Sequence, residues 1–224
     1  MLFTKIVLIY LFSNGDMLKS SSGVFICFEG IDGSGKTTHS RLIVGYLCGL
    51  GFDAVYTTEP TRYSLPGRKL RESFFAPERL PVEEEFHLFL EDRKIHLADE
   101  VIPQLEDGKI VITDRYYFSS VAFQGSYGLD WEYILEENLK IALVPDLVLL
   151  LDLNVEDAVS RIASDREEGV NTFENKENLK KVRNIYLKLA ERYPNLIHIF
   201  DVNKPIQDVQ DDIKQFIVDF LSKK

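Results

Sequence analysis

Hydrophobic positions in this 224-residue chain gather into short runs that are separated by longer stretches with a helical pattern. Five of the runs are apolar at both odd and even positions, which is typical of strands buried on both faces of a sheet. They cover residues 24–29, 54–58, 109–113, 147–151 and 196–200. The pattern therefore predicts five buried strands.

The stretches between these runs carry apolar residues at helical spacing, as in the closing segment with its apolar positions at Val209, Ile213, Phe216, Ile217 and Phe220. The predicted helices cover residues 36–47, 83–105, 131–143, 155–164, 178–193 and 206–221. Strands joined by helical crossovers form a mainly parallel sheet that is covered on both faces. We therefore predict a three-layer α/β fold whose ligands bind beyond the carboxyl ends of the strands.

A phosphate-binding loop follows the first predicted strand. Residues 30–37, GIDGSGKT, match the pattern GxxxxGK[ST] at every position and lie between a predicted strand and a predicted helix. The glycines let the backbone wrap a polyphosphate, Lys36 adds a point charge, and Thr37 can offer its hydroxyl to Mg²⁺. The predicted nucleotide-binding residues are Gly30, Ile31, Asp32, Gly33, Ser34, Gly35, Lys36, Thr37 and Thr38. The fold class is thus a P-loop NTPase fold with a five-stranded parallel sheet.

A second group suited to phosphate follows the third predicted strand, at the same edge of the sheet. Asp114 can hold Mg²⁺, and the planar guanidinium of Arg115 suits a second phosphate. Two such elements side by side indicate two phosphorylated ligands and transfer between them. An Asp–Arg pair that only caps the strand end stays open as the alternative.

A regulatory GTPase fits the sequence poorly. Its guanine-binding NKxD element would end in aspartate, whereas residues 203–206 read NKPI, and residues 114–117 read DRYY without the glycine that such a switch uses.

Four segments together resemble the thymidylate kinase family: FEGIDGSGKTT at 28–38, TTEP at 57–60, FLEDR at 89–93, and DRY at 114–116 with SSVAFQ at 119–124. The resemblance extends from residue 24 to the C-terminus, in the family's order and spacing. It implies an enzyme that transfers the γ-phosphoryl group of ATP to dTMP, giving ADP and dTDP, with Mg²⁺. A lid segment at about residues 155–178 also belongs to the implied fold.

The resemblance implies how the thymine base is held. Phe89 would stack on the base, Arg93 would hydrogen-bond its edge, and Ser120 would read it from the other side, with Gln124 in the same substrate-binding segment. Residue chemistry agrees, since an aromatic ring and an arginine four residues later share one side of a helix. Phe89 as a plain core residue stays open from spacing alone.

The resemblance also implies contacts to the sugar and the acceptor phosphate. Phe123 would crowd the 2′ position, Asp32 would face the 3′-hydroxyl, and Arg115 would hold the acceptor phosphate. Glu59 would organise metal, water or a neighbouring arginine. A phosphate monoester is mostly dianionic at pH 7, so no dedicated general base is expected, and catalysis is positioning and charge stabilisation.

In the lid segment, the resemblance sets Arg161 against adenine. Arg166 is the best candidate to reach the γ-phosphate, because the phosphate loop has Gly33 where some family members carry an arginine. Lys176 is the alternative, and a solvated, salt-bridged helix end is another reading of the segment. The predicted catalytic residues are Lys36, Asp114, Arg115 and Arg166, and the predicted metal ligands are Thr37 and Asp114.

One departure from the family pattern concerns Thr58. Many relatives have an arginine immediately before the Glu59-Pro60 pair, and Arg62 or Arg68 is expected to supply a substitute from the following loop.

The charge balance of 26 basic against 36 acidic residues gives a net charge of −10, which disfavours general binding to nucleic acid or to an anionic membrane. Cys27 and Cys48 lie in apolar segments, which predicts buried thiols in a reducing, cytoplasmic compartment. The expected partners are ATP and dTMP, and the family resemblance suggests a homodimer.

Residues 1–23 are expected to be a leader or extension, and residues 24–224 a single kinase domain. A signal or anchor, an ordered extension, and a start at Met17 remain open for the leader. Two other functions also remain open: a kinase for another nucleoside monophosphate or a deoxynucleoside, and a non-catalytic nucleotide-binding switch.

Overall fold

The computed structural model describes residues 23–165 and 172–224, and its centre is a five-stranded parallel sheet. The strands are β1 (Val24–Glu29), β2 (Ala54–Thr58), β3 (Ile110–Asp114), β4 (Leu147–Asp152) and β5 (Ile197–Asp201). Their spatial order is β2-β3-β1-β4-β5. Each predicted strand is present with its ends within one residue, so the predicted α/β fold is confirmed.

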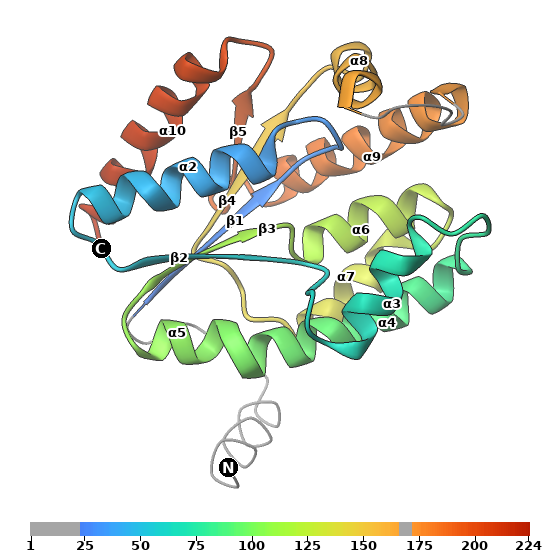
Figure 1. The fold of residues 1–224 in the computed structure, drawn as a ribbon, viewed down its shortest axis with the longest axis horizontal. Helices are drawn as coiled ribbons and strands as arrows, with labels where there is room; N and C mark the ends of the chain where they lie inside the picture. The colour runs from blue at the N-terminus through green and yellow to red at the C-terminus, as the bar shows by residue number, and fades with distance from the viewer. Residues whose placement is uncertain (1–22, 166–171) are drawn as a thin grey trace, which may run out of the picture.

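Helices cover both faces of the sheet (Figure 1). The helical elements are α2 (Lys36–Gly49), α3 (Leu65–Ser73), α4 (Val82–His96), η1 (Leu97–Val101), α5 (Ile102–Glu106), α6 (Tyr117–Ser126), α7 (Trp131–Leu139), α8 (Val155–Asp165), α9 (Thr172–Arg192) and α10 (Ile206–Leu221). Helices α2 and α10 pack together on one face, whereas α5 and α9 cover the other, and α6 packs against α9 and α7. The three-layer arrangement places β1 at the centre.

The helical pattern of the sequence misses two helices, α3 and α6. Helix α6 is buried on nearly all sides, so it has no polar stripe to reveal a helical period. Helix α3 is mostly polar and carries Pro66 and Gly67 in its first turn. The predicted helix over residues 83–105 is instead α4, η1 and α5 in succession, with a π-helical stretch at Leu97–Val101.

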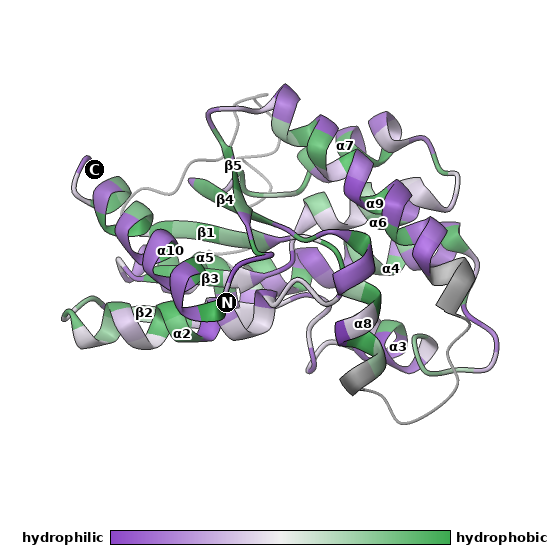
Figure 2. Cartoon of the chain, turned by 90° about the horizontal axis from the view of Figure 1, so that it is seen from above, coloured by the Kyte–Doolittle hydropathy of each residue, from purple (hydrophilic) through white to green (hydrophobic). Residues whose placement is uncertain are grey.

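The core lies on both sides of β1 and β4, whose ribbons are coloured as hydrophobic in Figure 2. Cys27 lies in this core as predicted, but Cys48 is exposed near the end of α2, where its thiol donates to the Ala54 carbonyl oxygen at 3.5 Å. Among the residues described, no helix has the length and apolar character needed to cross a membrane. The predictions for the leader concern residues that lie outside the described part, apart from Gly23.

The register of the sheet brings the ends of three strands to one edge. Phe28 in β1 and Thr58 in β2 both lie opposite Asp114 in β3. On the other side of β1, Glu29 lies opposite Leu150 in β4. The segments that follow β1, β2 and β3 therefore begin next to one another, which is where the sequence predicts the ligands.

Candidate active site

The phosphate loop between β1 and α2 turns so tightly that only glycine fits at its first position. Gly30 has a φ of 145°, and a Cβ there would lie 2.6 Å from the carbonyl oxygen of Leu151. Helix α2 follows directly and has no side-chain cap, so its first N–H groups are available to an anion. Lys36 donates from Nζ to the Ile31 carbonyl oxygen at 2.7 Å, across the loop.

Lys36 is only 6% exposed. Burial, and next the nearby charge of Arg115, lower the pKa of Lys36 to about 8. The ammonium group is therefore still mostly charged at neutral pH but close to losing its proton.

Thr37 and Asp114 meet beside the phosphate loop. The hydroxyl of Thr37 donates to Oδ2 of Asp114, whereas Oδ1 of Asp114 is buried and has no hydrogen-bond partner in the described part of the chain. A hydroxyl and a carboxylate with a spare oxygen are the donor set that Mg²⁺ takes when phosphates and water supply its other ligands. The two residues therefore fit a magnesium ion.

Arg115 joins the phosphate loop to α6. Its φ of 71° lies in the left-handed region, which no other non-glycine residue of the described part adopts. Its Nη2 forms an ion pair with Asp32, and its Nη1 donates to the Ser119 hydroxyl at 3.1 Å. The guanidinium carbon lies 4.8 Å from the centre of the Phe123 ring. The two elements that the sequence predicts to bind phosphate thus lie side by side.

One cavity of about 960 Å³ runs from the phosphate loop to the aromatic residues of α4 and α6. Thirteen of the predicted site residues line it: Asp32, Gly33, Gly35, Lys36, Thr37, Thr38, Glu59, Phe89, Asp114, Arg115, Phe123, Gln124 and Arg161. A single cavity with both a phosphate loop and an aromatic compartment can hold two ligands face to face.

Other predicted residues support the cavity from behind. Gly30, Ile31 and Ser34 belong to the wrap of the loop but do not line it. Arg93 and Ser120 are also absent from the lining, and each is only 1% exposed. The sequence predicts direct base contacts for these two, whereas the structure places both within a buried polar network.

That network centres on Arg93. The guanidinium donates to Oδ1 of Asn138, to Oε2 of Glu59, and to the Ser120 hydroxyl at 3.2 Å. Its Nε is buried and has no partner among the described residues. Burial alone would raise the pKa of Glu59, but the charge of Arg93 and a hydrogen bond from His96 keep it below the usual value. Glu59 therefore organises a neighbouring arginine, one of the roles expected from the sequence.

Sequence reasoning missed Arg71, which lines the cavity from the last turn of α3. Its Nε donates to the Thr61 carbonyl oxygen at 3.4 Å, and the buried Asp92 fixes that segment by accepting the Thr61 N–H at 2.7 Å. Recognition of α3 in the sequence would have pointed to Arg71. The sequence predicts that Arg62 or Arg68 substitutes for the arginine that many relatives carry where this chain has Thr58. Arg62 lines the cavity, whereas Arg68 does not.

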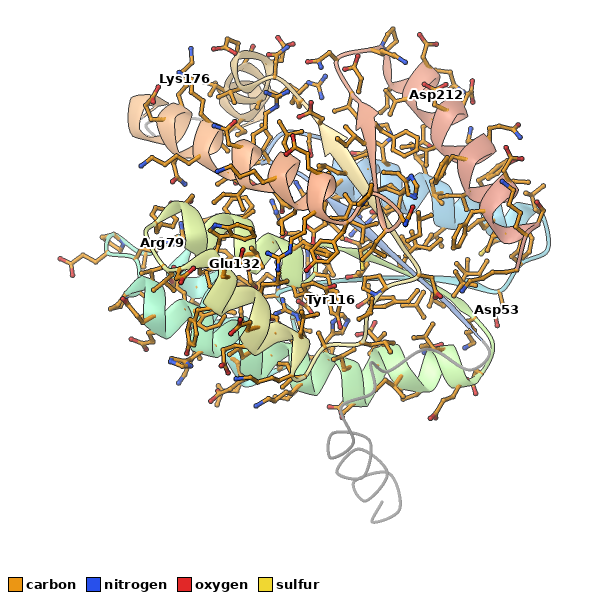
Figure 3. The ribbon with its side chains drawn as sticks, turned by 180° about the vertical axis from the view of Figure 1, so that it is seen from behind. Asp53, Arg79, Tyr116, Glu132, Lys176 and Asp212 are labelled. Atoms are coloured by element: carbon orange, nitrogen blue, oxygen red, sulfur yellow. The ribbon has the colours of Figure 1, made fainter. Side chains whose placement is uncertain are left out.

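An aromatic and cationic rim closes the outer end of the cavity, and the sequence carries no motif for it. Phe74 stacks beside Phe89 with ring centres 6.5 Å apart. Arg79 lies 5.3 Å from the Phe74 ring and 5.1 Å from the Tyr127 ring, and donates to the Tyr127 hydroxyl at 3.1 Å. Figure 3 shows Arg79 at the outer edge of the helices that carry this rim.

At the opposite end of the cavity, Arg161 spans the phosphate loop and the segment after β5. It donates to the carbonyl oxygens of Gly33 at 3.3 Å and Val202 at 3.1 Å. Arg166 lies outside the described residues. Lys176, the alternative in the lid, pairs with Glu156 of α8 at 2.9 Å and does not line the cavity (Figure 3).

The fold and this cavity define the class of phosphate-loop nucleotide kinases. The thymidylate kinase family model matches residues 28–213. A thymidylate kinase of Brachyspira hyodysenteriae is 40% identical over 85% of this chain and 91% of its own length. Similar identity, 40%, is found with a thymidylate kinase of Desulfotalea psychrophila (88% of this chain, 95% of that protein) and a probable one of Thermococcus onnurineus (90% and 100%). The chain belongs to the thymidylate kinase family.

The pKa of Lys36 predicts how nucleotide binding depends on pH. Its positive charge is present below about pH 8 and is lost as the pH rises through that value. The affinity for ATP should therefore weaken by about tenfold between pH 7 and pH 9. Isothermal titration calorimetry at both pH values measures this change. A Lys36→Met variant should bind ATP weakly with the same affinity at both, and a pH-independent wild type would contradict the assignment.

Proposed function

We propose that this chain transfers the γ-phosphoryl group of ATP to dTMP, giving ADP and dTDP. The observation that best supports the acceptor is Gln124 on α6, which lines the same cavity as Phe89. Its Oε1 is an acceptor without a hydrogen-bond partner among the described residues.

Thymine complements Gln124, because its N3–H can donate to Oε1. Cytosine presents an acceptor at N3, so it would leave Oε1 unpaired. An unpaired buried polar group in a binding site can reduce turnover by about 10⁴-fold. Phe89, half-buried on the cavity wall, supplies a stacking face for the base. Phe123 would crowd the 2′ position of the sugar.

The phosphates would meet at the edge formed by β1 and β3. The loop amides and Lys36 would hold the ATP phosphates, Arg115 would hold the acceptor phosphate, and Asp32 would bind the sugar 3′-hydroxyl. Thr37 and Asp114 would hold Mg²⁺, which when bound neutralises charge that develops on the transferred group. The acceptor phosphate is already dianionic at pH 7, so the residues need only orient it toward the γ-phosphorus.

The lid segment would supply two further contacts to ATP. Arg161 would lie against adenine, and Arg166 would approach the γ-phosphate from the lid segment. Lys176, the alternative, would have to leave its exposed ion pair with Glu156 to do so.

The function is tested by measuring ADP release with ATP, Mg²⁺ and a panel of acceptors. We expect fast turnover with dTMP and at least 100-fold lower kcat/KM with dCMP, because cytosine mismatches Gln124. Equal turnover with dUMP, dCMP or thymidine would instead support a broader nucleotide or deoxynucleoside kinase. A basal rate of ATP or GTP hydrolysis that no acceptor changes would support a nucleotide-binding switch.

The replacement for the missing arginine at Thr58 gives a separate prediction. Arg62 is exposed on the cavity wall and raises the local positive potential that Arg71 experiences. The Arg62→Ala variant should raise the KM for dTMP about fivefold to tenfold, as expected for one charge-assisted contact to phosphate.

Arg68→Ala is the matched control, because Arg68 donates to the Tyr63 carbonyl oxygen at 2.7 Å and does not line the cavity. Its KM for dTMP should equal that of the wild type. An unchanged KM in both variants would reject the idea that either arginine compensates for Thr58.

The family resemblance supports a homodimer packed through helices beside the sheet, and a cytoplasmic location in which the thiols stay reduced. Helix α7, which exposes Tyr133 and Leu139, would supply part of that interface. Residues 24–224 would form one kinase domain, with the lid at about residues 155–178.

A further inference from the structure

Helix α6, which carries the acceptor-side residues, begins without a side-chain cap of its own. The first N–H groups of a helix have no partner within the helix and need one from elsewhere. Oε1 of Glu29 accepts the Tyr116 N–H at 2.9 Å and also accepts the Ser119 N–H at 3.2 Å, which Ser119 shares with the Tyr116 carbonyl oxygen at 3.0 Å. Glu29 is the last residue of β1, so the strand that leads into the phosphate loop also caps the acceptor helix.

The second oxygen of Glu29 is held from two further elements. Oε2 accepts from the Ser119 hydroxyl at 2.6 Å and from the Tyr186 hydroxyl of α9 at 2.8 Å. The carboxyl is 0% exposed, and all four partners are donors. Burial raises the pKa of Glu29, whereas the hydrogen bond from Ser119 and the charge of Arg115 oppose that rise. The positive end of α6 also favours a carboxylate here.

Arg115 is held by hydrogen bonds next to those of Glu29. Its own N–H donates to the Phe28 carbonyl oxygen at 2.9 Å, and the next N–H, of Tyr116, donates to Glu29. Its guanidinium donates to the Ser119 hydroxyl, the same group that donates to Glu29. The left-handed backbone at Arg115 is unfavourable for a residue with a Cβ, so the surrounding contacts must hold it. Tyr116, beside it, lies near the centre of the molecule (Figure 3).

We propose that Glu29 is a positioning residue for phosphoryl transfer: it caps α6 and, through Ser119, fixes the direction of Arg115. The inference rests on the proposed function, in which Arg115 holds the acceptor phosphate. Tyr186 contributes from α9, the helix that also places Asn178 on the cavity wall. One buried carboxylate therefore joins the strand before the phosphate loop, the acceptor helix and α9.

The test is Glu29→Gln, which keeps the shape of the side chain but replaces one acceptor oxygen by an amide donor. The kcat/KM for dTMP should fall about 10- to 100-fold, because a small misplacement of a substrate-positioning group has effects of that order. The KM for ATP should change much less than the kcat/KM for dTMP, since Glu29 accepts its hydrogen bonds from the start of α6 and from α9 and not from the phosphate loop. An unchanged kcat/KM for dTMP would overturn the proposal.

A double-mutant cycle separates positioning of Arg115 from a general structural role. If Glu29 acts through Arg115, adding Glu29→Gln to Arg115→Ala should cause no further loss of kcat/KM. Losses that multiply would overturn the proposal. If Glu29→Gln fails to fold, Tyr186→Phe takes its place in the cycle, with an expected loss of about threefold to tenfold for one missing hydrogen bond.

Asp146→Asn is the matched control. Asp146 also accepts a backbone N–H of β1, from Phe25 at 2.8 Å, but does so at the opposite end of the strand. Its kcat/KM should equal that of the wild type. If the proposed function fails, the wild type will not turn over dTMP, and the ratio of variant to wild-type kcat/KM would then be measured with the acceptor that it uses. If only the positioning role fails, the wild type will turn over dTMP, but these ratios of kcat/KM will differ from those expected.

Discussion

The parallel pairing of β1 with β3 is the contact on which the rest of the site depends. It sets Phe28 opposite Asp114, so the two chain segments that can bind phosphate leave the sheet at adjacent points. Both segments then turn through backbone conformations that strands and helices do not use, at Gly30 and at Arg115. Such turns persist only where neighbouring contacts fix them, and here Glu29 and the β4 backbone at Leu151 lie directly against them.

The same arrangement explains how a chain with a net charge of −10 can hold two anions. Its cationic groups at the cavity are fixed by local partners: Arg115 pairs with Asp32, and Lys36 binds the carbonyl oxygen of Ile31. The backbone amides of the loop and the start of α2 add positive potential without adding charged residues. In the proposed function, recognition of phosphate is thus a property of one edge of the sheet, whereas the net negative charge of the chain disfavours polyanions.

The sequence was sufficient to predict the strands, the sheet and the phosphate loop, because these depend on local apolar runs and on a contiguous motif. It was insufficient for α3 and α6, since one is polar with Pro66 in its first turn and the other is buried on almost every side. Arg71 lies on α3 and Arg79 on the loop that follows it, so the sequence pattern did not indicate that either lines the cavity. Spacing also placed Arg93 beside the base, but could not show that Glu59 and Asn138 already bind its terminal nitrogens.

In the proposed function, the phosphoryl group passes directly between two nucleotides in one continuous cavity, and the residues position it and stabilise charge but take no phosphoryl group themselves. The stereochemical course at phosphorus tests this most directly. With ATP made chiral at the γ-phosphorus by sulfur and oxygen isotopes, a single in-line transfer to dTMP predicts inversion of configuration in the dTDP formed. Retention of configuration would require two successive transfers through a group on the protein and would contradict direct transfer.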